Sequence, residues 1–325
     1  MSNQLNSTAS DQVSRKGIKK SKPIALIIAG MHRSGTSALS RVINLLGADL
    51  PPDLMNPAED NKSGFWESIK LSKIHDELLD SLDSSWDSVT PIPSDFYKSI
   101  IIEKYHEDIL CFLQENFKNS RFFAIKDPRI CRLIPVWIKV LRDFNAEARF
   151  IIPFRNPLEV ANSLRRRNNF STSKSLLLWL RYILEAEQYT RNQQRSFITY
   201  ETLLTNWYAV AEKIETDLNF TWPRKSLNVR LDIERFLSPD FRHHHVQDDF
   251  LQSTPQVAGW VLETYEALQD LITNAHKVVS LEKLDTINYD IQTADTIYGM
   301  VLVDHQSEMT VLRKKIITLD NQWQE

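Results

Sequence analysis

Short apolar runs alternate along the chain with longer stretches in which apolar residues recur every three or four positions. The run Ile24–Ala29 is continuously apolar, which is typical of a strand that is covered on both faces. Three later segments have the same character, namely residues 122–126, 149–154 and 196–200. The pattern therefore predicts four strands.

Helical spacing separates these strands. Leu39, Val42, Ile43 and Leu46 recur at helical intervals, and Gly47 is well placed to end that helix. Further helices are predicted over 69–82 and 133–144, from the Asn156-Pro157 cap onward, and over 173–189. Strands that alternate with helices predict an α/β fold, a parallel sheet flanked by helices on both faces. In such a sheet, ligands bind at the carboxyl ends of the strands.

The two ends of the chain differ from this middle. Residues 1–22 are almost free of apolar side chains and predict a disordered tail, so the α/β domain is expected over 23–254. Residues 255–325 predict a helical C-terminal extension. Its last part carries a short heptad seam of Met309, Leu312, Ile316, Leu319 and Trp323. Docking of this helix on its own domain is the main interpretation, and self-association through 305–325 is the alternative.

Composition limits the class of protein. The chain has 325 residues, 42% hydrophobic and 25% charged, as in an ordinary soluble globular protein. Its net charge of −3 excludes a generally basic nucleic-acid binder. No run approaches the ~18 apolar residues that span a bilayer, so a cytoplasmic location is expected. Cys111 and Cys131 fit neither a metal-site spacing nor a disulfide scaffold.

The segment between the first strand and the first helix has the composition of a phosphate-binding loop. Its glycines let backbone N–H groups face an anion, and the helix N-terminus adds positive potential. The spacing matches a Walker A loop, but Thr36 stands where an NTPase has Lys, and no predicted strand ends in an acidic magnesium ligand. We therefore expect a nucleotide phosphate to bind without a metal. The residues expected to hold it are Gly30, His32, Arg33, Ser34, Gly35, Thr36 and Ser37.

Other polar residues stand at the ends of the later strands. Arg155 ends the third strand, and Ser163 lies two helical turns farther on, so both can converge on one phosphate. Lys126 ends the second strand, and Tyr200 the fourth. Between Lys126 and Arg167 there are ten Lys or Arg but only four Asp or Glu. Positive charge is therefore concentrated where the ligand is expected.

Four segments, in order over residues 23–205, resemble the P-loop sulfotransferase superfamily, most nearly its Golgi-type and bacterial glycan sulfotransferases. They are GMHRSGTSALSR (30–41), Lys126-Asp127-Pro128, RNPLEVANS (155–163) and Tyr200-Glu201-x-Leu203. The resemblance implies 3′-phosphoadenosine 5′-phosphosulfate (PAPS) as donor, with no metal. It implies that the first segment holds the 5′-phosphosulfate, the third the 3′-phosphate, and that the fourth lies near the adenine. The implied acceptor is a hydroxyl, with a glycan favoured and no nucleic acid involved.

Transfer to a hydroxyl needs a base that takes the hydroxyl proton. Glu67, in a Gly-Phe-Trp-Glu stretch similar to one in glycan sulfotransferases, is the first candidate; Glu59 and Asp60 are neighbouring rivals, and His75 is a weaker one. Arg33 is expected to neutralise the leaving phosphate. Lys126 is expected to act on the oxygen that bridges phosphate and sulfate. The alternative for Lys126 is a structural ion pair with Asp127 or Glu67.

Several features have two interpretations. Trp66 either stacks on a sugar or fills the core, Arg165–Arg167 either bind an anionic ligand or form a solvated face, and His243–His245 predict an exposed loop rather than a metal site. The acceptor pocket is expected from residues 50–100 and 220–260, which do not identify the acceptor. A degenerate P-loop kinase of a nucleotide or small molecule is one competing function, and a non-catalytic donor-binding module is another.

Overall fold

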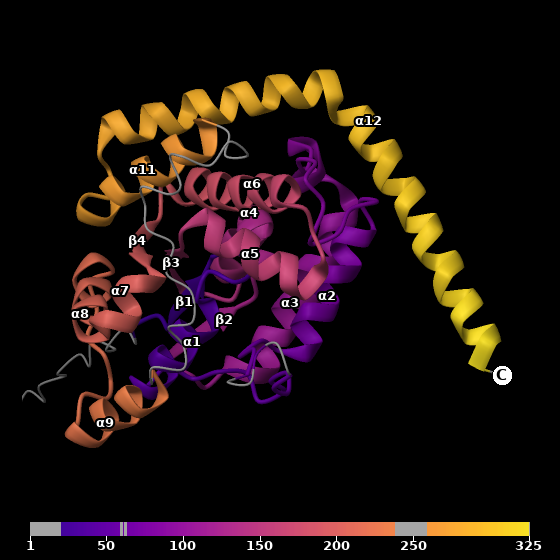
Figure 1. Cartoon of the computed structure of the whole chain (residues 1–325). Helices are drawn as coiled ribbons and strands as arrows, with labels where there is room; N and C mark the ends of the chain where they lie inside the picture. The colour runs from indigo at the N-terminus through magenta and orange to yellow at the C-terminus, as the bar shows by residue number, and fades with distance from the viewer. Residues whose placement is uncertain (1–20, 59–60, 62–63, 238–258, 325) are drawn as a thin grey trace, which may run out of the picture.

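The computed structural model describes residues 21–58, 61, 64–237 and 259–324 (Figure 1). The predicted disordered tail therefore lies outside the described residues except for its last two positions. Glu59, Asp60 and His243–His245 also lie outside them.

Four parallel strands form the predicted sheet. They are β1 (Ile24–Ile28), β2 (Phe122–Lys126), β3 (Glu147–Phe154) and β4 (Gln194–Thr199), in the order β2-β1-β3-β4. Ile28 pairs with Lys126 on one side and with Ile151 on the other, so the carboxyl ends of β1 and β2 are level. The α/β architecture predicted from the alternating pattern is confirmed.

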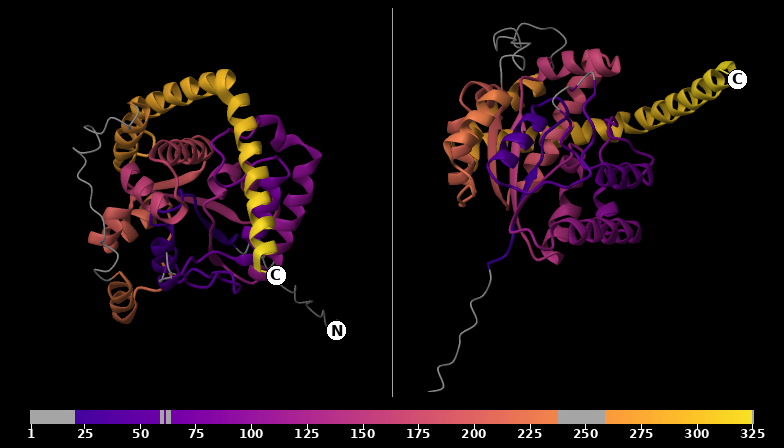
Figure 2. Two further views of the ribbon diagram at one scale, coloured as in Figure 1. Left: turned by 45° about the vertical axis from the view of Figure 1, so that its right-hand side comes forward. Right: turned by 90° about the horizontal axis from the view of Figure 1, so that it is seen from below.

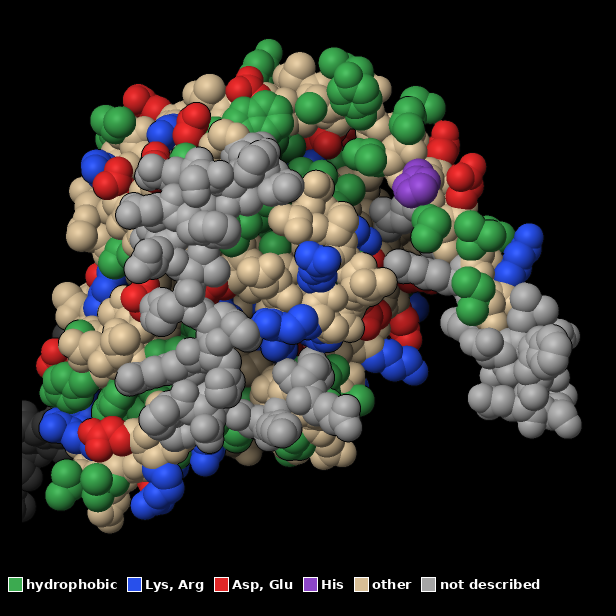
Figure 3. Space-filling view, in the orientation of Figure 1, with side chains coloured by type: hydrophobic (Ala, Val, Ile, Leu, Met, Phe, Trp, Pro, Cys, Tyr) green, Lys and Arg blue, Asp and Glu red, His purple; other side chains and the backbone are tan. Residues whose placement is uncertain are grey.

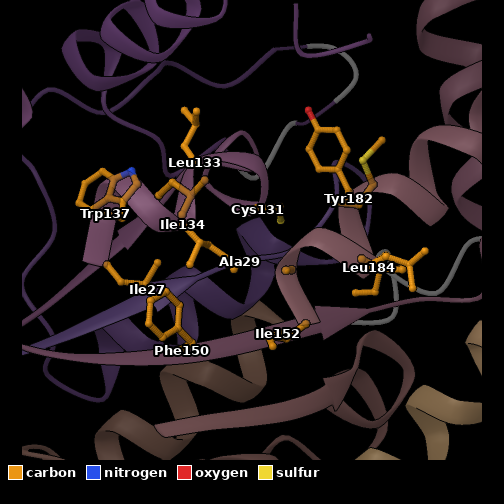
Figure 4. Close-up of a cluster of buried hydrophobic side chains, with 14 of the residues drawn as sticks. Ile27, Ala29, Cys131, Leu133, Ile134, Trp137, Phe150, Ile152, Tyr182 and Leu184 are labelled. Carbon is orange, nitrogen blue, oxygen red and sulfur yellow. The ribbon is translucent and has the colours of Figure 1, made fainter. Parts of the chain in front are cut away.

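Helices cover both faces of the sheet because successive strand residues point to opposite sides. Ala25 and Ile27 of β1 join one core, and Leu26 and Ile28 join the other. The first core is closed mainly by α3 (Ile100–Phe117), α4 (Ile130–Asp143), α6 (Thr172–Thr190) and α11 (Gly259–Thr273). Figure 4 shows part of it, with Trp137 and Phe150 beside Ile27. The second core is closed by α1 (Thr36–Leu45), α8 (Trp207–Asp217) and α9 (Leu227–Phe236).

The remaining elements also contribute buried side chains to the two cores. They are α2 (Ile69–Asp80), the 3₁₀ turn η1 (Ser94–Lys98), α5 (Pro157–Asn168) and α7 (Tyr200–Thr205). The Asn156 side chain accepts from Leu158 N with Pro157 in the first turn, as the sequence predicted. Helices α3, α8 and α9 lie in segments for which the apolar pattern predicted no element.

The C-terminal part of the chain contains one 47-residue helix, α12 (Val278–Gln324). Its first part packs into the first core through Leu284, Ile287 and Ile291. Its second part stands away from the body in Figure 1 and in the right-hand view of Figure 2. Met309, Leu312 and Ile316 are 39%, 51% and 57% exposed, so the predicted docking on the same domain is wrong for the part of the seam whose side chains the structure describes. The contour length of this helix is ~70 Å, and Figure 1 shows a bend between its two parts.

In the part of the chain that the structure describes, no helix combines the length and apolarity needed to cross a membrane.

Candidate active site

Residues 29–35, for which the sequence predicts phosphate binding and which we call the phosphate loop, join β1 to α1 in a tight turn. Arg33 and Gly35 both adopt left-handed conformations, with φ of 68° and 82°. A Cβ on Gly35 would lie 2.0 Å from the Tyr200 ring, so only glycine fits there. Helix α1 then begins at Thr36 without a side-chain cap on its N-terminus. Its first-turn N–H groups are therefore available to an anion.

Two arginines and a serine from distant segments converge beside this loop. Arg33 Nε donates to Ser163 Oγ at 2.8 Å, and Arg155 Nη1 donates to the Arg33 carbonyl at 3.4 Å. The Arg155 guanidinium stacks over the Tyr200 ring at 4.9 Å and pairs with Glu159 at 2.5 Å. Guanidinium and hydroxyl donors grouped in this way suit a phosphate group. The structure thus brings Arg33, Arg155, Ser163 and Tyr200 together.

Lys126 and Glu67 form a buried pair on the other side of the loop. Lys126 Nζ donates to Glu67 Oε1, to the Phe65 carbonyl at 3.0 Å and to Ser37 Oγ at 3.3 Å. The two side chains are 2% and 8% exposed. Burial raises the pKa of the Glu67 carboxyl, although Lys126 opposes the rise. Lys126 therefore brings an ammonium from β2 to the start of α1, where the loop itself has Thr36 in place of lysine.

Asp127 and Arg129 form a network of charged side chains beside this pair. Asp127 is buried and accepts from Ser72 Oγ at 3.0 Å and from the Arg129 backbone N–H at 2.9 Å. Arg129 also pairs with Asp127 at 3.0 Å and with Asp76 at 2.6 Å. Burial alone would raise the pKa of Asp127, but Arg129 and His75 beside it bring that pKa well below its usual range. Asp127 follows β2 directly, yet its carboxylate is committed to these partners and not presented as a metal ligand.

His75 belongs to this network rather than to the reacting centre. It is fully buried, and Trp137 Nε1 donates to its Nε2 at 3.1 Å. Its Nδ1 lies 3.1 Å from Asp127 Oδ2. With both ring nitrogens facing protein groups, His75 has the position of a residue that orients Asp127. The role of catalytic base predicted for it does not fit this position.

A cavity of ≈ 210 Å³ opens over the phosphate loop and the Lys126–Glu67 pair. The His32 ring packs against Trp86 in its wall, with ring centroids 4.6 Å apart. Burial, with Arg129 and Arg167 nearby, lowers the pKa of His32 well below its usual value and so favours the neutral imidazole. The lining residues are His32, Arg33, Thr36, Ser37, Met55, Asn61, Phe65, Glu67, Trp86, Lys126, Pro128, Arg129 and Arg167.

The structure distinguishes residues that the sequence left undecided. Arg165–Arg167 form the basic last turn of α5, and Figure 3 shows blue side chains near the middle of the face over that helix. Of the three, Arg167 lines the cavity, with its guanidinium 5.4 Å from the Trp86 ring. Trp66 lines a different surface cavity of ≈ 700 Å³ and lies under the Arg41 guanidinium at 4.8 Å.

Arg129 is the cavity residue that the sequence reasoning missed most clearly. It follows the Lys126-Asp127-Pro128 segment directly, and the Asp127 carboxylate caps its backbone N–H. An aspartate two residues before an arginine at a strand end is a local signal for this arrangement. Asn61 was also missed; its side-chain amide donates to the Gly64 carbonyl at 2.7 Å and so holds the segment before Glu67.

No group of three or more His, Cys, Asp or Glu side chains suited to a metal ion occurs among residues 21–58, 61, 64–237 and 259–324.

No protein-family model and no curated protein matches this sequence. Among solved structures, the chain is similar to the sulfotransferase domain from the Synechococcus PCC 7002 olefin synthase. The TM-score is 0.40 at 16% identity, covering 75% of this chain and 94% of that chain. It is also similar to sulfotransferase STF1 from Mycobacterium tuberculosis H37Rv, with a TM-score of 0.36 at 10% identity, covering 66% and 71%. Similarity at this level assigns no function, which has to come from the site residues.

Proposed function

We propose that this protein transfers a sulfuryl group from PAPS to a hydroxyl acceptor, with a carbohydrate as the favoured acceptor. The observation that carries the proposal is the arrangement at the carboxyl ends of β1, β2 and β3. There the phosphate loop lies between a phosphate-binding group (Arg33, Arg155 and Ser163) and a buried acid–base pair (Lys126 and Glu67).

Donor binding uses the first of these groups. The 5′-phosphosulfate is placed on the loop amides and the N-terminus of α1, which favour negative charge. The 3′-phosphate is placed on Arg155 and Ser163. Arg33 lines the cavity and also donates to Ser163, so one side chain connects the two ends of the donor. Tyr200, packed on Gly35 and under Arg155, is assigned to the adenosine.

The chemical step uses the second group. The acceptor oxygen attacks sulfur, the bond from sulfur to the bridging oxygen breaks, and the hydroxyl proton passes to the Glu67 carboxylate. A raised pKa makes Glu67 a better proton acceptor once it is ionised. The Lys126 ammonium neutralises the charge that develops on the leaving 5′-phosphate oxygen, and the neighbouring Ser37 hydroxyl and Phe65 carbonyl hold it in place.

The cavity wall supports a carbohydrate as acceptor. Trp86 supplies an aromatic surface, and Asn61 and Arg129 add polar side chains to the cavity lining. Sugar rings are recognised by this combination of an apolar face and polar edges.

The test combines calorimetry with labelled transfer. We expect adenosine 3′,5′-bisphosphate to bind without magnesium, and [³⁵S]PAPS to label a hydroxyl compound in a panel of methyl glycosides, tyrosine peptides and alkyl alcohols. Magnesium-dependent ATP binding with phosphoryl transfer would instead indicate a degenerate kinase. Bisphosphate binding without transfer to any panel compound would indicate a donor-binding module.

A further inference from the structure

Trp86, in the cavity wall, is carried by a segment that is neither helix nor strand. Residues 85–90 lie between α2 and η1, and four of their carbonyl groups accept hydrogen bonds from outside the segment. Tyr182 Oη donates to the Trp86 carbonyl at 2.6 Å, and Arg181 Nε donates to the Val89 carbonyl at 3.1 Å. Arg132 donates to the carbonyls of Ser88 at 3.1 Å and Thr90 at 2.5 Å.

These donors are buried side chains of α4 and α6. Tyr182 and Arg132 are fully buried and Arg181 is 4% exposed. Hydrogen bonds from a charged guanidinium are stronger than those between neutral groups. These three side chains, together with Lys174 of α6, which pairs with Asp87 at 2.7 Å, therefore fix the path of the segment and with it the Trp86 ring against His32.

Arg181 has a second partner, which lies in the C-terminal extension. Its Nη2 donates to both carboxylate oxygens of Asp295 in α12, at 2.9 and 2.8 Å. Beyond Asp295, Ile297 and Tyr298 are already 64% and 63% exposed. Among the described residues, this pair is the farthest point along α12 at which a hydrogen bond or ion pair joins the helix to the rest of the protein. Figure 1 shows α12 passing over α6 before it leaves the body.

We propose that Asp295 is a positioning residue for the cavity. By fixing the Arg181 guanidinium it fixes the Val89 carbonyl, and through the 85–90 segment it holds Trp86 at the acceptor side of the cavity. The C-terminal helix thereby determines the shape of the acceptor site. The statement about the acceptor rests on the proposed function, whereas the mechanical coupling from Asp295 to residues 85–90 does not.

Hydrogen exchange measured by mass spectrometry on the full chain tests the coupling. In Asp295→Asn we expect exchange in a peptide over 85–92 to rise by about tenfold, because one charged hydrogen bond is weakened. The Ser88 N–H, which donates to the Ser85 carbonyl at 3.1 Å, reports this opening directly. Peptides from β1 and α11 should exchange as in the wild type.

The chain offers a matched control in Asp285→Asn. Asp285 of α12 pairs at 2.7 Å with Arg191, the C-cap residue of α6, so this pair also joins the two helices. The other partners of Arg191 are Glu187 and the Gln188 carbonyl, which lie outside the 85–90 segment. Equal exchange of the 85–92 peptide in Asp295→Asn and Asp285→Asn, whether raised in both or unchanged in both, would overturn the coupling.

Kinetics separate a positioning role from general destabilisation. In Asp295→Asn we expect KM for the panel compound most strongly labelled by [³⁵S]PAPS to rise about tenfold. The affinity for adenosine 3′,5′-bisphosphate should be unchanged, and so should both values in Asp285→Asn. Arg181→Lys should behave like Asp295→Asn, because an ammonium does not reproduce the planar guanidinium fork. Faster exchange with an unchanged KM would overturn the link to the acceptor. Absence of any transfer would count against the proposed function, while the exchange data would still decide the coupling.

Discussion

Arg33 and Ser163 are 130 residues apart in the sequence, yet they are joined by a 2.8 Å hydrogen bond beside Arg155. Arg155→Ala should weaken binding of adenosine 3′,5′-bisphosphate by ~1.5–3 kcal/mol, the range for a hydrogen bond to a charged group. The buried Glu159 carboxylate, which Arg155 now neutralises, pushes the loss toward the upper end. Ser163→Ala should cost less, ~0.5–1.5 kcal/mol. Calorimetry checks both, and an unchanged affinity in Arg155→Ala would remove the 3′-phosphate assignment.

Substitution of Lys126 should change turnover but not the binding of adenosine 3′,5′-bisphosphate. Lys126→Ala should reduce turnover by ~100-fold or more and leave the affinity for the bisphosphate nearly intact, because its contact matters chiefly in the transition state. The measurement is single-turnover transfer beside calorimetry on the same variant. Since Lys126 also pairs with Glu67, a lower melting temperature is expected as well. Normal turnover with only the lower melting temperature would show that the pair is structural.

Glu67 leads to a prediction about pH. A base must be ionised to act, so activity should be lost as the pH falls through the pKa of Glu67. Burial raises that pKa, so the acidic limb of kcat/KM should lie above the ~4.3 of an ordinary glutamate. Glu67→Gln should abolish most turnover and remove this limb from whatever activity remains. A limb at the ordinary glutamate value, or one retained in Glu67→Gln, would assign the base elsewhere.

At the scale of elements, the turn from β2 into α4 depends on Asp127. Its pKa is depressed in the folded state, so it stabilises the fold at pH values above its unfolded pKa of ~3.9. That stability is lost as the pH falls toward the depressed value. Asp127→Asn should therefore cost ~3 kcal/mol at pH 7, as for a broken buried ion pair, and less below pH ~4. Urea unfolding at both pH values measures this, and an equal cost at both would contradict the charge argument.

The sequence predicted an element best where the pattern of apolar residues along the chain is enough to define it. The four strands lie within two residues of their predicted positions because a covered parallel strand is an apolar run. The tight turn between β1 and α1 was predictable because glycine and helix spacing define it locally. The contacts of His75 were not predictable: the spacing of Leu71 and Leu78 places His75 on the buried face of α2, but it does not say which side chains of other elements lie there. The Lys126–Glu67 pair was foreseen only as an alternative, since it depends on how the Phe65–Glu67 segment returns to the sheet edge.

For the whole molecule, the unexplained feature is the outer part of α12. Tyr298, Leu312 and Ile316 are 63%, 51% and 57% exposed, and a helix standing alone in water is only marginally stable. Exposed apolar rows of this kind mark interaction surfaces. The heptad spacing matches a second copy of the same seam, and Glu308 and Lys315, of opposite charge, occupy flanking positions beside it. Self-association of two chains, kept as a prediction from the sequence, therefore remains the expectation.

Sedimentation equilibrium on the full chain tests this expectation with a matched pair of variants. The wild type should be a dimer at micromolar concentration. Leu312→Glu should shift it to monomer, because it places charge inside the seam. Val311→Glu should leave the dimer intact, since Val311 is equally exposed at 52% but lies off the seam. The bisphosphate affinity of both variants should equal that of the wild type, because the seam stands outside the cavity. A monomeric wild type, or equal dissociation by both substitutions, would contradict pairing through this seam.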